Sequence, residues 1–353
     1  MLVIVIVIVI ATTMKPPSPV LPSRLLPFDA HNHIHMGPSE PIVAVVNKEV
    51  PSEPLLSGVA IMSTHPKDYP TVSELQESLP KACPGLRVVP CFGVHPWWLH
   101  ELTEEDWKPI PIVPTESIHD LPVSGIGAAA AAATTTTTTK TGERTTRPAW
   151  VVRLEERIRT NPLSIVGEIG LDGFHFDPKT GDLTSSIEEQ VKAFELMMGV
   201  AVRQDRPVSI HAVQSFGPLM ESLSRLKKKK NKKNKNGLGL PPKMYFHAFG
   251  GKEGTVDQLT ALCGRKQGSV YFGFAPVVNF RSNKTFKVIR KVGLNRLVLE
   301  TDHEDAGLVL HSMEEGIRLV AEALEESEER VVEVTTRNAF DLYGLGSGDG
   351  DLC

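Results

Sequence analysis

Four histidines and two carboxylates in this sequence have the residue types expected of metal ligands. They are His31, His33, Glu168, His211, His247 and Asp302. His31 and His33 are two residues apart, so an extended backbone presents both imidazoles on the same side. Glu168 has two oxygens with which it can bridge a pair of cations, which a histidine cannot do. Imidazole and carboxylate together suit Zn²⁺, Mn²⁺ or iron, whereas Mg²⁺ prefers a richer oxygen shell.

Regular elements must position these residues, and the hydrophobic pattern predicts which elements they are. Eight short apolar runs are the candidate strands: 25–31, 58–64, 86–94, 164–171, 207–212, 243–249, 269–274 and 296–302. Amphipathic stretches lie between them, including 185–204, in which Ser185 and Glu188 have capping-box spacing, and 254–265. The stretch 312–326 is the expected outer helix after the eighth strand. This alternation predicts an α/β fold, the TIM (β/α)₈ barrel.

All the candidate ligands fall at or near the C-terminal ends of the candidate strands. They belong to the first strand (His31 and His33), the fourth (Glu168), the fifth (His211), the sixth (His247) and the eighth (Asp302). Active sites of TIM barrels lie at the C-terminal face, where residues from several strands converge. We therefore expect these residues to share one pocket, although they are far apart in the sequence.

Six short motifs follow one another along the chain in the order of a known family. They are FDAHNH, GVHP, VGEIGLD, SIHA, HAFGG and LETDH, and they lie between Pro27 and Asn338. With two inserts excluded, this stretch resembles the TatD family of metal-dependent deoxyribonucleases, and it is most similar to a fungal branch of that family. The match is specific because each motif sits at its expected strand.

The resemblance implies a centre of two divalent cations, Mg²⁺, Mn²⁺ or Zn²⁺, held by two pairs of histidines: His31 with His33, and His211 with His247. Glu168 would bridge the two ions. Asp302 would coordinate near the attacking water and take its proton, so Asp302 and Glu168 are the expected catalytic residues. His95, in the GVHP motif, would line the substrate pocket without being a principal ligand.

The activity implied by the resemblance is hydrolysis of phosphodiester bonds in DNA. Two alternatives stay open: an amidohydrolase-type enzyme that cleaves a C–N or ester bond, and a non-enzymatic interaction protein that keeps the barrel and the metal site. Many amidohydrolases bridge their metals with a carboxylated lysine, whereas Glu168 stands at the strand-four position here, which favours the phosphodiesterase. An intact ligand set opposes the interaction protein.

Two departures from the family pattern bear on the substrate. In many bacterial members an arginine follows shortly after the strand-five histidine, whereas Ala212, Val213 and Gln214 follow it here. The usual ETD-S-P sequence after strand eight is replaced by ETDHED at 300–305, which places additional acid beside the site. Both changes weaken the case for ordinary DNA hydrolysis more than the case for metal binding.

The distribution of charge limits the ways in which this protein could hold nucleic acid. The formal net charge is −4, but the segment 227–235 contains seven lysines and no acidic residue. The rest of the chain carries 31 basic and 42 acidic residues, so bulk charge does not favour broad electrostatic binding to nucleic acid. A DNA substrate would have to be held mainly by the metals and by local contacts.

We expect one domain with two low-complexity loop insertions. Residues 25–345 would form the barrel, with inserts at about 127–146 and 227–240, either of which could bind a protein partner. Residues 1–24 are expected to be a disordered or mis-assigned N-terminal tail, with Met14 as an alternative initiator, and residues 346–353 a C-terminal tail.

The remaining features indicate the cellular setting. The ten-residue apolar run near the start is too short to span a membrane, so no membrane association is expected. Four scattered cysteines without a C-x-x-C pair indicate reduced thiols in an intracellular protein, which we expect to be cytoplasmic or nuclear. Neither the pattern nor the composition fixes the oligomeric state.

Overall fold

The computed structural model describes residues 25–37, 55–112, 146–229, 239–264, 268–281 and 284–346. Both predicted tails, apart from residue 346, and most of the two predicted inserts lie outside these ranges. No helix within the described ranges has both the length and the apolar character that a membrane span requires.

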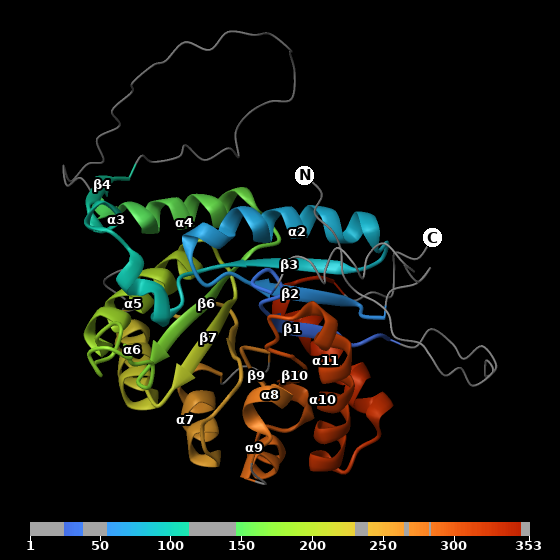
Figure 1. Cartoon of the computed structure of the whole chain (residues 1–353). Helices are drawn as coiled ribbons and strands as arrows, with labels where there is room; N and C mark the ends of the chain where they lie inside the picture. The colour runs from blue at the N-terminus through green and yellow to red at the C-terminus, as the bar shows by residue number, and fades with distance from the viewer. Residues whose placement is uncertain are drawn as a thin grey trace.

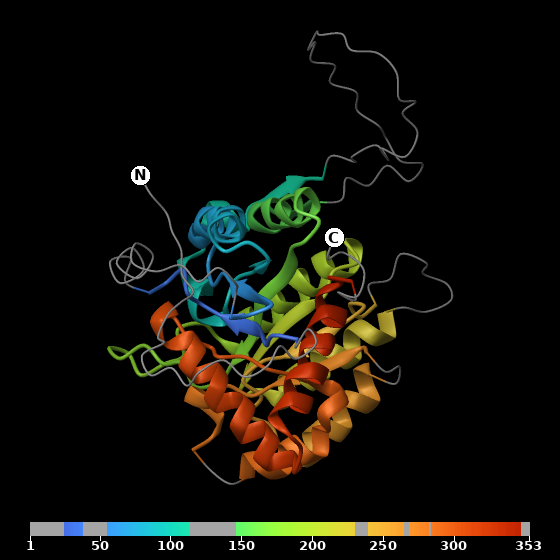
Figure 2. The ribbon, with the colours of Figure 1, turned by 90° about the vertical axis from the view of Figure 1, so that its right-hand side faces the viewer.

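Eight parallel strands form a barrel with helices around it, which confirms the predicted TIM fold (Figures 1 and 2). Their order in the sheet is β1-β2-β3-β6-β7-β8-β9-β10. The strands are β1 (Phe28–Asn32), β2 (Gly58–Met62), β3 (Arg87–Phe92), β6 (Ile165–Asp172), β7 (Val208–Val213), β8 (Met244–Phe246), β9 (Val270–Gly273) and β10 (Leu297–Val298). Each lies where the sequence pattern predicts a strand. The arrowheads of β6 and β7 mark the C-terminal end of the barrel, at the left of Figure 1.

The barrel closes between β1 and the segment that follows β10. Three backbone hydrogen bonds of 2.8 to 2.9 Å join them, from the amides of Ala30, His33 and Asp302 to the carbonyls of Leu299, His303 and His31. The buried Asp29 carboxylate adds to the closure, since it accepts from the Thr301 amide at 3.0 Å and from the Thr301 hydroxyl at 2.7 Å. The eighth strand ends at Val298, earlier than predicted. Asp302 therefore lies in the loop beyond β10, with a φ of 56°.

The helices alternate with the strands along the chain and pack around the outside of the barrel. The longer ones are α2 (Tyr69–Ala82), α4 (Ala149–Thr160), α5 (Ile187–Arg203), α6 (Phe216–Lys229), α7 (Glu253–Cys263), α9 (Lys284–Val292), α10 (Val309–Leu324) and α11 (Glu328–Tyr343). The shorter ones are η1 (Pro66–Asp68), η2 (Pro96–Glu101), α3 (Glu104–Trp107), α8 (Pro276–Asn279), η4 (Leu294–Arg296) and η5 (Ala306–Leu308). The expected outer helix after the eighth strand is α10.

Three local predictions need correction. The capping box of α5 uses Ser186 and Glu189 rather than Ser185 and Glu188, because the motif S-x-x-E occurs in both registers and the helix begins one residue later. Helix α6 extends through Lys229, so the second insert begins later than 227. The first insert ends before Thr146, because β5 (Thr146–Pro148) pairs antiparallel with β4 (Pro109–Pro111) in an unpredicted small sheet.

Two apolar clusters form the core. The larger one lies between the strands and the outer helices, and the smaller one fills the barrel interior and includes residues of α11. Phe28, which is 1% exposed, packs edge-on against Phe340, with ring centroids 6.0 Å apart. The Tyr343 hydroxyl donates to the carbonyl of Ala30 at 2.6 Å. Burying one such phenylalanine contributes about 1.5–3 kcal/mol. Helix α11 thus closes the N-terminal end of the barrel and leaves the opposite end for chemistry.

Candidate metal centre

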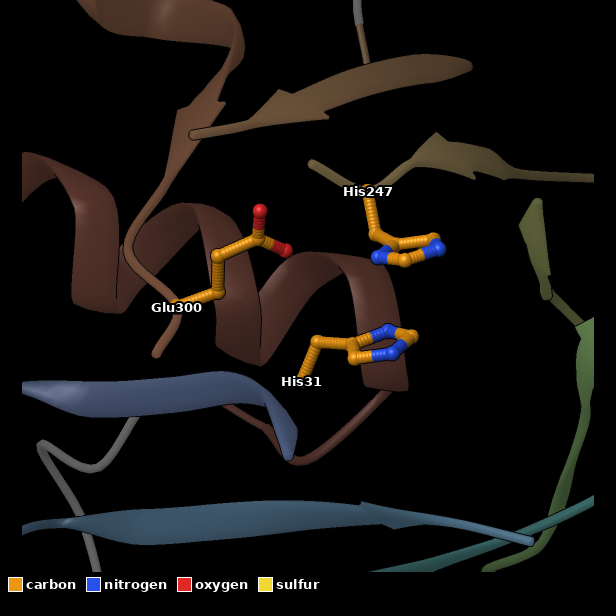
Figure 3. Close-up of side chains that lie close together, drawn as sticks. All are labelled: His31, His247 and Glu300. Atoms are coloured by element: carbon orange, nitrogen blue, oxygen red, sulfur yellow. The ribbon is translucent and has the colours of Figure 1, made fainter. Parts of the chain in front are cut away.

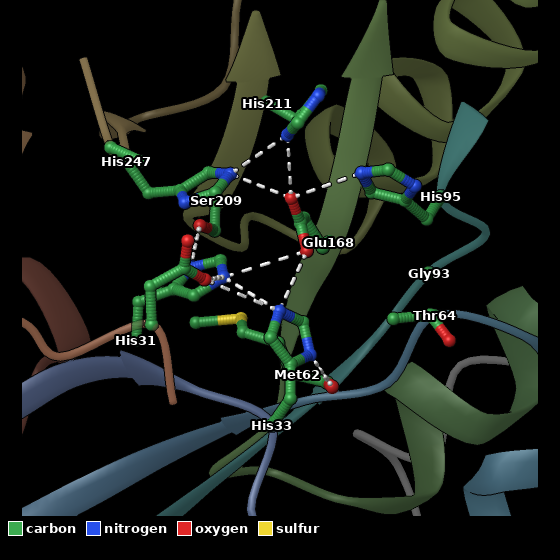
Figure 4. A network of polar contacts seen from close by, with 12 residues as sticks. His31, His33, Met62, Thr64, Gly93, His95, Glu168, Ser209, His211 and His247 are labelled. Atoms are coloured by element: carbon green, nitrogen blue, oxygen red, sulfur yellow. Dashed lines mark hydrogen bonds and ion pairs between the residues drawn. The ribbon is translucent and has the colours of Figure 1, made fainter. Parts of the chain in front are cut away.

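The structure brings all six predicted ligands together at the C-terminal end of the barrel, and it adds His95 to them (Figure 4). Glu168 of β6 stands at the middle of this group. It is 2% exposed, and each of its two carboxylate oxygens faces a different set of side chains.

The oxygen Oε2 of Glu168 faces the residues that come from the barrel closure. It lies 3.1 Å from Nε2 of His33 and 3.4 Å from Nε2 of His31. Oδ1 of Asp302 lies 3.6 Å from each of these two nitrogens. We call His31, His33 and Asp302 the closure trio.

The oxygen Oε1 of Glu168 faces three histidines. It lies 2.6 Å from Nε2 of His247, 3.1 Å from Nδ1 of His211 and 3.3 Å from Nε2 of His95. We call these three residues the histidine trio. The sequence predicts His95 in the pocket wall, and in the structure its donor atom also lies within 4.8 Å of those of Glu168 and His211.

The spacing of the donor atoms tests whether cations fit here. Ligands bound at 2.0–2.2 Å in a tetrahedron lie about 3.3 Å from one another. Nε2 of His31 and Nε2 of His33 are 3.2 Å apart, and so are Nδ1 of His211 and Nε2 of His247. His31, His33 and Glu168 have donor atoms within 4.8 Å of one another, and so do His95, Glu168 and His211, so each set could hold a metal ion.

Hydrogen bonds outside the trios determine which ring nitrogen points inward. Nδ1 of His33 donates to the carbonyl of Met62 at 3.0 Å, and Nδ1 of His31 lies 3.2 Å from the Ser209 hydroxyl. The Nε2 atoms of both rings are thereby left for the centre. Such outer partners fix the tautomer of a metal-binding histidine and orient its ring.

His211 has the opposite orientation because its outer partner is Asp172. Nε2 of His211 lies 2.9 Å from Oδ2 of Asp172, so Nδ1 faces the centre. The same Oδ2 accepts a 2.7 Å hydrogen bond from the Trp97 indole. Burial raises the pKa of Asp172, but the hydrogen bonds from His211 and Trp97 outweigh burial and lower this pKa to about 2. The outer partner is thus an ionised carboxylate.

The electrostatics of the centre favour positive charge. Burial raises the pKa of Glu168, but the neighbouring charges of His247, His95 and His31 outweigh it and hold the pKa well below its usual range. Burial lowers the pKa of His33, but its hydrogen bond to Glu168 and the nearby carboxylates raise it to about 9. A divalent cation would bring the positive charge that Glu168 stabilises here.

Glu300 lies beside the centre and was not predicted as a site residue. The rings of His31 and His247 stack at 3.7 Å, with the Glu300 carboxyl close to both (Figure 3). Burial and the charge of Asp302 raise the pKa of Glu300 well above its usual value. Its oxygens accept from the Tyr245 hydroxyl and, at 2.6 Å, from the Ala248 amide. Glu300 therefore anchors the segment after β8, and its carboxyl also lies within reach of a cation held between His31 and His247.

Sequence reasoning missed the contacts of two residues in this region. The contact of Asp172 with His211 was not predicted. The VGEIGLD motif contained the signal, since four residues in an extended strand place Glu168 and Asp172 on the same face. The contact between the Trp97 indole and Asp172 depends on the path of η2 and could not be inferred from spacing.

Comparison with known proteins agrees with this geometry. The TatD related DNase family matches residues 28–344. The Cut9-interacting protein scn1 of Schizosaccharomyces pombe is 24% identical over 329 residues, covering 84% of this chain and 92% of its own. Deoxyribonuclease TATDN3 of Homo sapiens is 28% identical over 187 residues, covering 51% of this chain and 60% of its own.

The structure of YjjV, a TatD homolog from Escherichia coli, superposes with a TM-score of 0.60 at 18% identity, over 91% of this chain and 98% of its own. That likeness supports the fold. The family match spans nearly the whole barrel and includes every motif that supplies a residue to the centre. The chain therefore belongs to the TatD related DNase family and is a metal-dependent hydrolase of that family.

Proposed function

We propose that this protein hydrolyses phosphodiester bonds in DNA at a centre of two divalent cations. The observation that carries the proposal is the position of the Glu168 carboxylate, whose two oxygens face two separate trios of donor atoms. A carboxylate placed between two such sets is suited to bridging a pair of ions. The closure trio and the histidine trio would each hold one ion, and the nitrogen-rich donor set favours Zn²⁺ or Mn²⁺ over Mg²⁺.

The protein's own residues would position the substrate and move the proton. When bound, the cations supply Lewis-acid chemistry that polarises a phosphoryl oxygen and makes a nearby water more acidic. The side chain of Asp302 is 17% exposed, against 2% for Glu168, so Asp302 is the carboxylate that water reaches more easily. Burial also raises the pKa of Asp302 above its usual value, which favours its acting as a base. We assign to Asp302 the acceptance of the water's proton.

The substrate class rests on the family and on the chemistry of the centre. The family is described as DNases, and TATDN3 is named a deoxyribonuclease. A nucleic-acid substrate agrees with a nuclear or cytoplasmic location. A second candidate role is protein binding, because scn1, which aligns with most of this chain, is named a Cut9-interacting protein.

A substrate and metal panel tests the proposal. The protein is stripped of metal, reloaded with Mg²⁺, Mn²⁺ or Zn²⁺, and incubated with single-stranded DNA, duplex DNA, RNA, and small ester and amide substrates. We expect cleavage of DNA that requires a cation and is lost in Glu168→Gln purified in the same way, which controls for contaminating nuclease. Turnover of an amide or ester without DNA cleavage would indicate an amidohydrolase. Bound cation without any turnover would favour the protein-binding role.

A further inference from the structure

One nitrogen of the His247 ring is turned away from both trios. Nε2 of His247 lies 2.6 Å from Oε1 of Glu168, whereas Nδ1 of the same ring is buried and has no hydrogen-bond partner within the described ranges. The side chain is 3% exposed, so solvent does not reach this nitrogen easily. Buried polar atoms in folded proteins are normally partnered, and an ion is one group that satisfies such an atom.

His31 and Glu300 lie at the same edge of the His247 ring. The two imidazoles are stacked with their planes 6° from parallel, and Figure 3 shows the Glu300 carboxyl pointing at their edges. One donor atom of each of these three residues lies within 4.8 Å of the other two, and all three residues are buried. Two imidazole nitrogens and one carboxylate oxygen are the protein ligands of zinc sites that keep a fourth position open.

The charges around these three residues favour a cation. Asp29 accepts from the amide and the hydroxyl of Thr301, the residue between Glu300 and Asp302, so three acidic side chains gather here. Their partners in the described part of the chain are histidines, hydroxyls and amides rather than lysine or arginine. Buried carboxylates are normally paired with an opposite charge or bound to a metal ion.

We propose that His31, His247 and Glu300 form an inner site for one divalent cation, which is occupied in place of the two-ion centre. The exclusion arises because the closure trio needs His31 and the histidine trio needs His247. A neutral imidazole has one lone pair, so a ring that binds a cation through one nitrogen keeps a proton on the other. By mass action, a rising cation concentration would convert this one-ion form into the two-ion form. The exclusion rests on the proposed two-ion centre, whereas the inner site itself does not.

Calorimetric titration of Zn²⁺ into metal-free protein tests the inner site. The parent for this test carries Glu168→Gln, which removes the carboxylate that the two trios share and keeps every donor of the inner site. Glu300→Gln is then added, and its amide oxygen can still accept from the Ala248 amide. His33→Ala and His211→Ala, each added separately to the parent, are the matched controls. Each removes a histidine from one trio and leaves the inner site intact.

We expect the parent to bind one Zn²⁺ and both histidine controls to match it. The variant with Glu300→Gln should bind about tenfold more weakly or worse, since loss of even an outer partner of a ligand typically costs 10–100-fold in metal affinity. A parent that binds no Zn²⁺ would overturn the inner site. So would a loss of affinity in either histidine control as large as that in the Glu300→Gln variant, because the ion would then belong to a trio.

Nuclear magnetic resonance covers the case in which Glu300→Gln does not fold. In ¹⁵N-histidine-labelled Glu168→Gln protein, Zn²⁺ at the inner site should shift Nδ1 of His247 and leave Nε2 protonated. A shift of Nε2 instead would place the ion with the histidine trio and overturn the proposal. In the wild-type protein Nδ1 should respond to the first equivalent of Zn²⁺ and Nε2 to the second, and a response of Nε2 alone would overturn the exclusion. Because cation binding is measured without turnover, these results are independent of whether the wild-type protein cleaves DNA.

Discussion

Nε2 of His211 lies 2.9 Å from Oδ2 of Asp172, and this contact turns the other ring nitrogen, Nδ1, towards Glu168. Among the histidines of the two trios, His211 has an ionised carboxylate as its outer partner, while His33 has a backbone carbonyl and His31 a hydroxyl. The negative charge makes Nδ1 of His211 a stronger donor to a cation. The two trios therefore depend on outer partners of different charge.

Asp172→Asn should weaken cation binding by the histidine trio. The amide keeps the shape and one acceptor but loses the charge, and loss of such outer partners typically costs 10–100-fold in metal affinity. Competition with a chromophoric chelator measures the affinity of each site. Trp97→Phe removes one hydrogen bond to Asp172 and keeps its charge, so it should have a smaller effect. Equal losses in both variants would show that geometry, rather than charge, is what Asp172 provides.

Glu168→Gln should lower the content of both cations. A neutral amide cannot present an anionic oxygen to each trio, and Glu168 is the residue that both trios share. His31→Ala should instead deplete the ion of the closure trio and leave that of the histidine trio. Elemental analysis of protein dialysed against a fixed metal buffer measures both. Wild-type content in both variants would contradict the two-ion assignment.

Asp302→Asn should fold normally, keep at least part of its metal and lose kcat by about 10²–10⁴-fold with little change in KM. Asparagine has nearly the same shape but cannot accept a proton at neutral pH. Steady-state kinetics on any substrate that the protein turns over provide the measurement. Activity within a few-fold of wild type would remove Asp302 from the mechanism, and complete loss of metal would make it primarily a ligand.

Glu155→Gln should destabilise the fold in a pH-dependent way. Nε and an Nη atom of Arg203 donate to the Glu155 carboxylate at 2.6 and 2.9 Å, and Arg147 also contacts it. Burial raises the pKa of Glu155, but its contacts with Arg203 and Arg147 outweigh burial and lower the pKa. The pair therefore stabilises the fold above the unfolded-state pKa of about 4.3 and loses this contribution as pH falls through the lower folded-state pKa.

At pH 7 the substitution should reduce the free energy of unfolding by about 1–2 kcal/mol, and the difference from wild type should shrink below about pH 4. Urea unfolding at both pH values measures it. Glu156→Gln on the same helix is the matched control, since Glu156 contacts Arg159 in an exposed i, i+3 pair and should change stability little. A pH-independent loss in Glu155→Gln would mean that packing, and not charge, is what the residue contributes.

The sequence predicted the strands well because most of the buried strands are short apolar runs separated by polar stretches. Gly58–Met62 and Val270–Gly273 are wholly buried and carry no charged residue, so their composition leaves little choice of structure. The residue that caps the N-terminus of α5 could not be predicted in the same way. Ser185 and Ser186 both stand three residues before a glutamate, and only tertiary packing decides where α5 begins.

Residue type and strand position predicted which side chains gather at the centre, but not which of them face each oxygen of Glu168. The assignment of His95 to the Oε1 side of Glu168, and the inward-facing Nδ1 of His211, both depend on side-chain rotamers and on partners far away in the sequence. The position of α11 across the N-terminal end of the barrel was also not predicted, because its apolar face has the same pattern as that of a helix on the outside of the barrel. Long-range packing, rather than local propensity, decided these features.

The closure of the barrel by the first and last strands has a consequence for how the centre forms during synthesis. A growing chain contains every residue of the histidine trio and Glu168 once His247 has been made, but the closure trio is incomplete until Asp302 follows. A chain truncated between these two positions would retain the whole histidine trio and lack Asp302 of the closure trio. The closure trio is therefore complete only when the chain has been made through the segment that closes the barrel against β1.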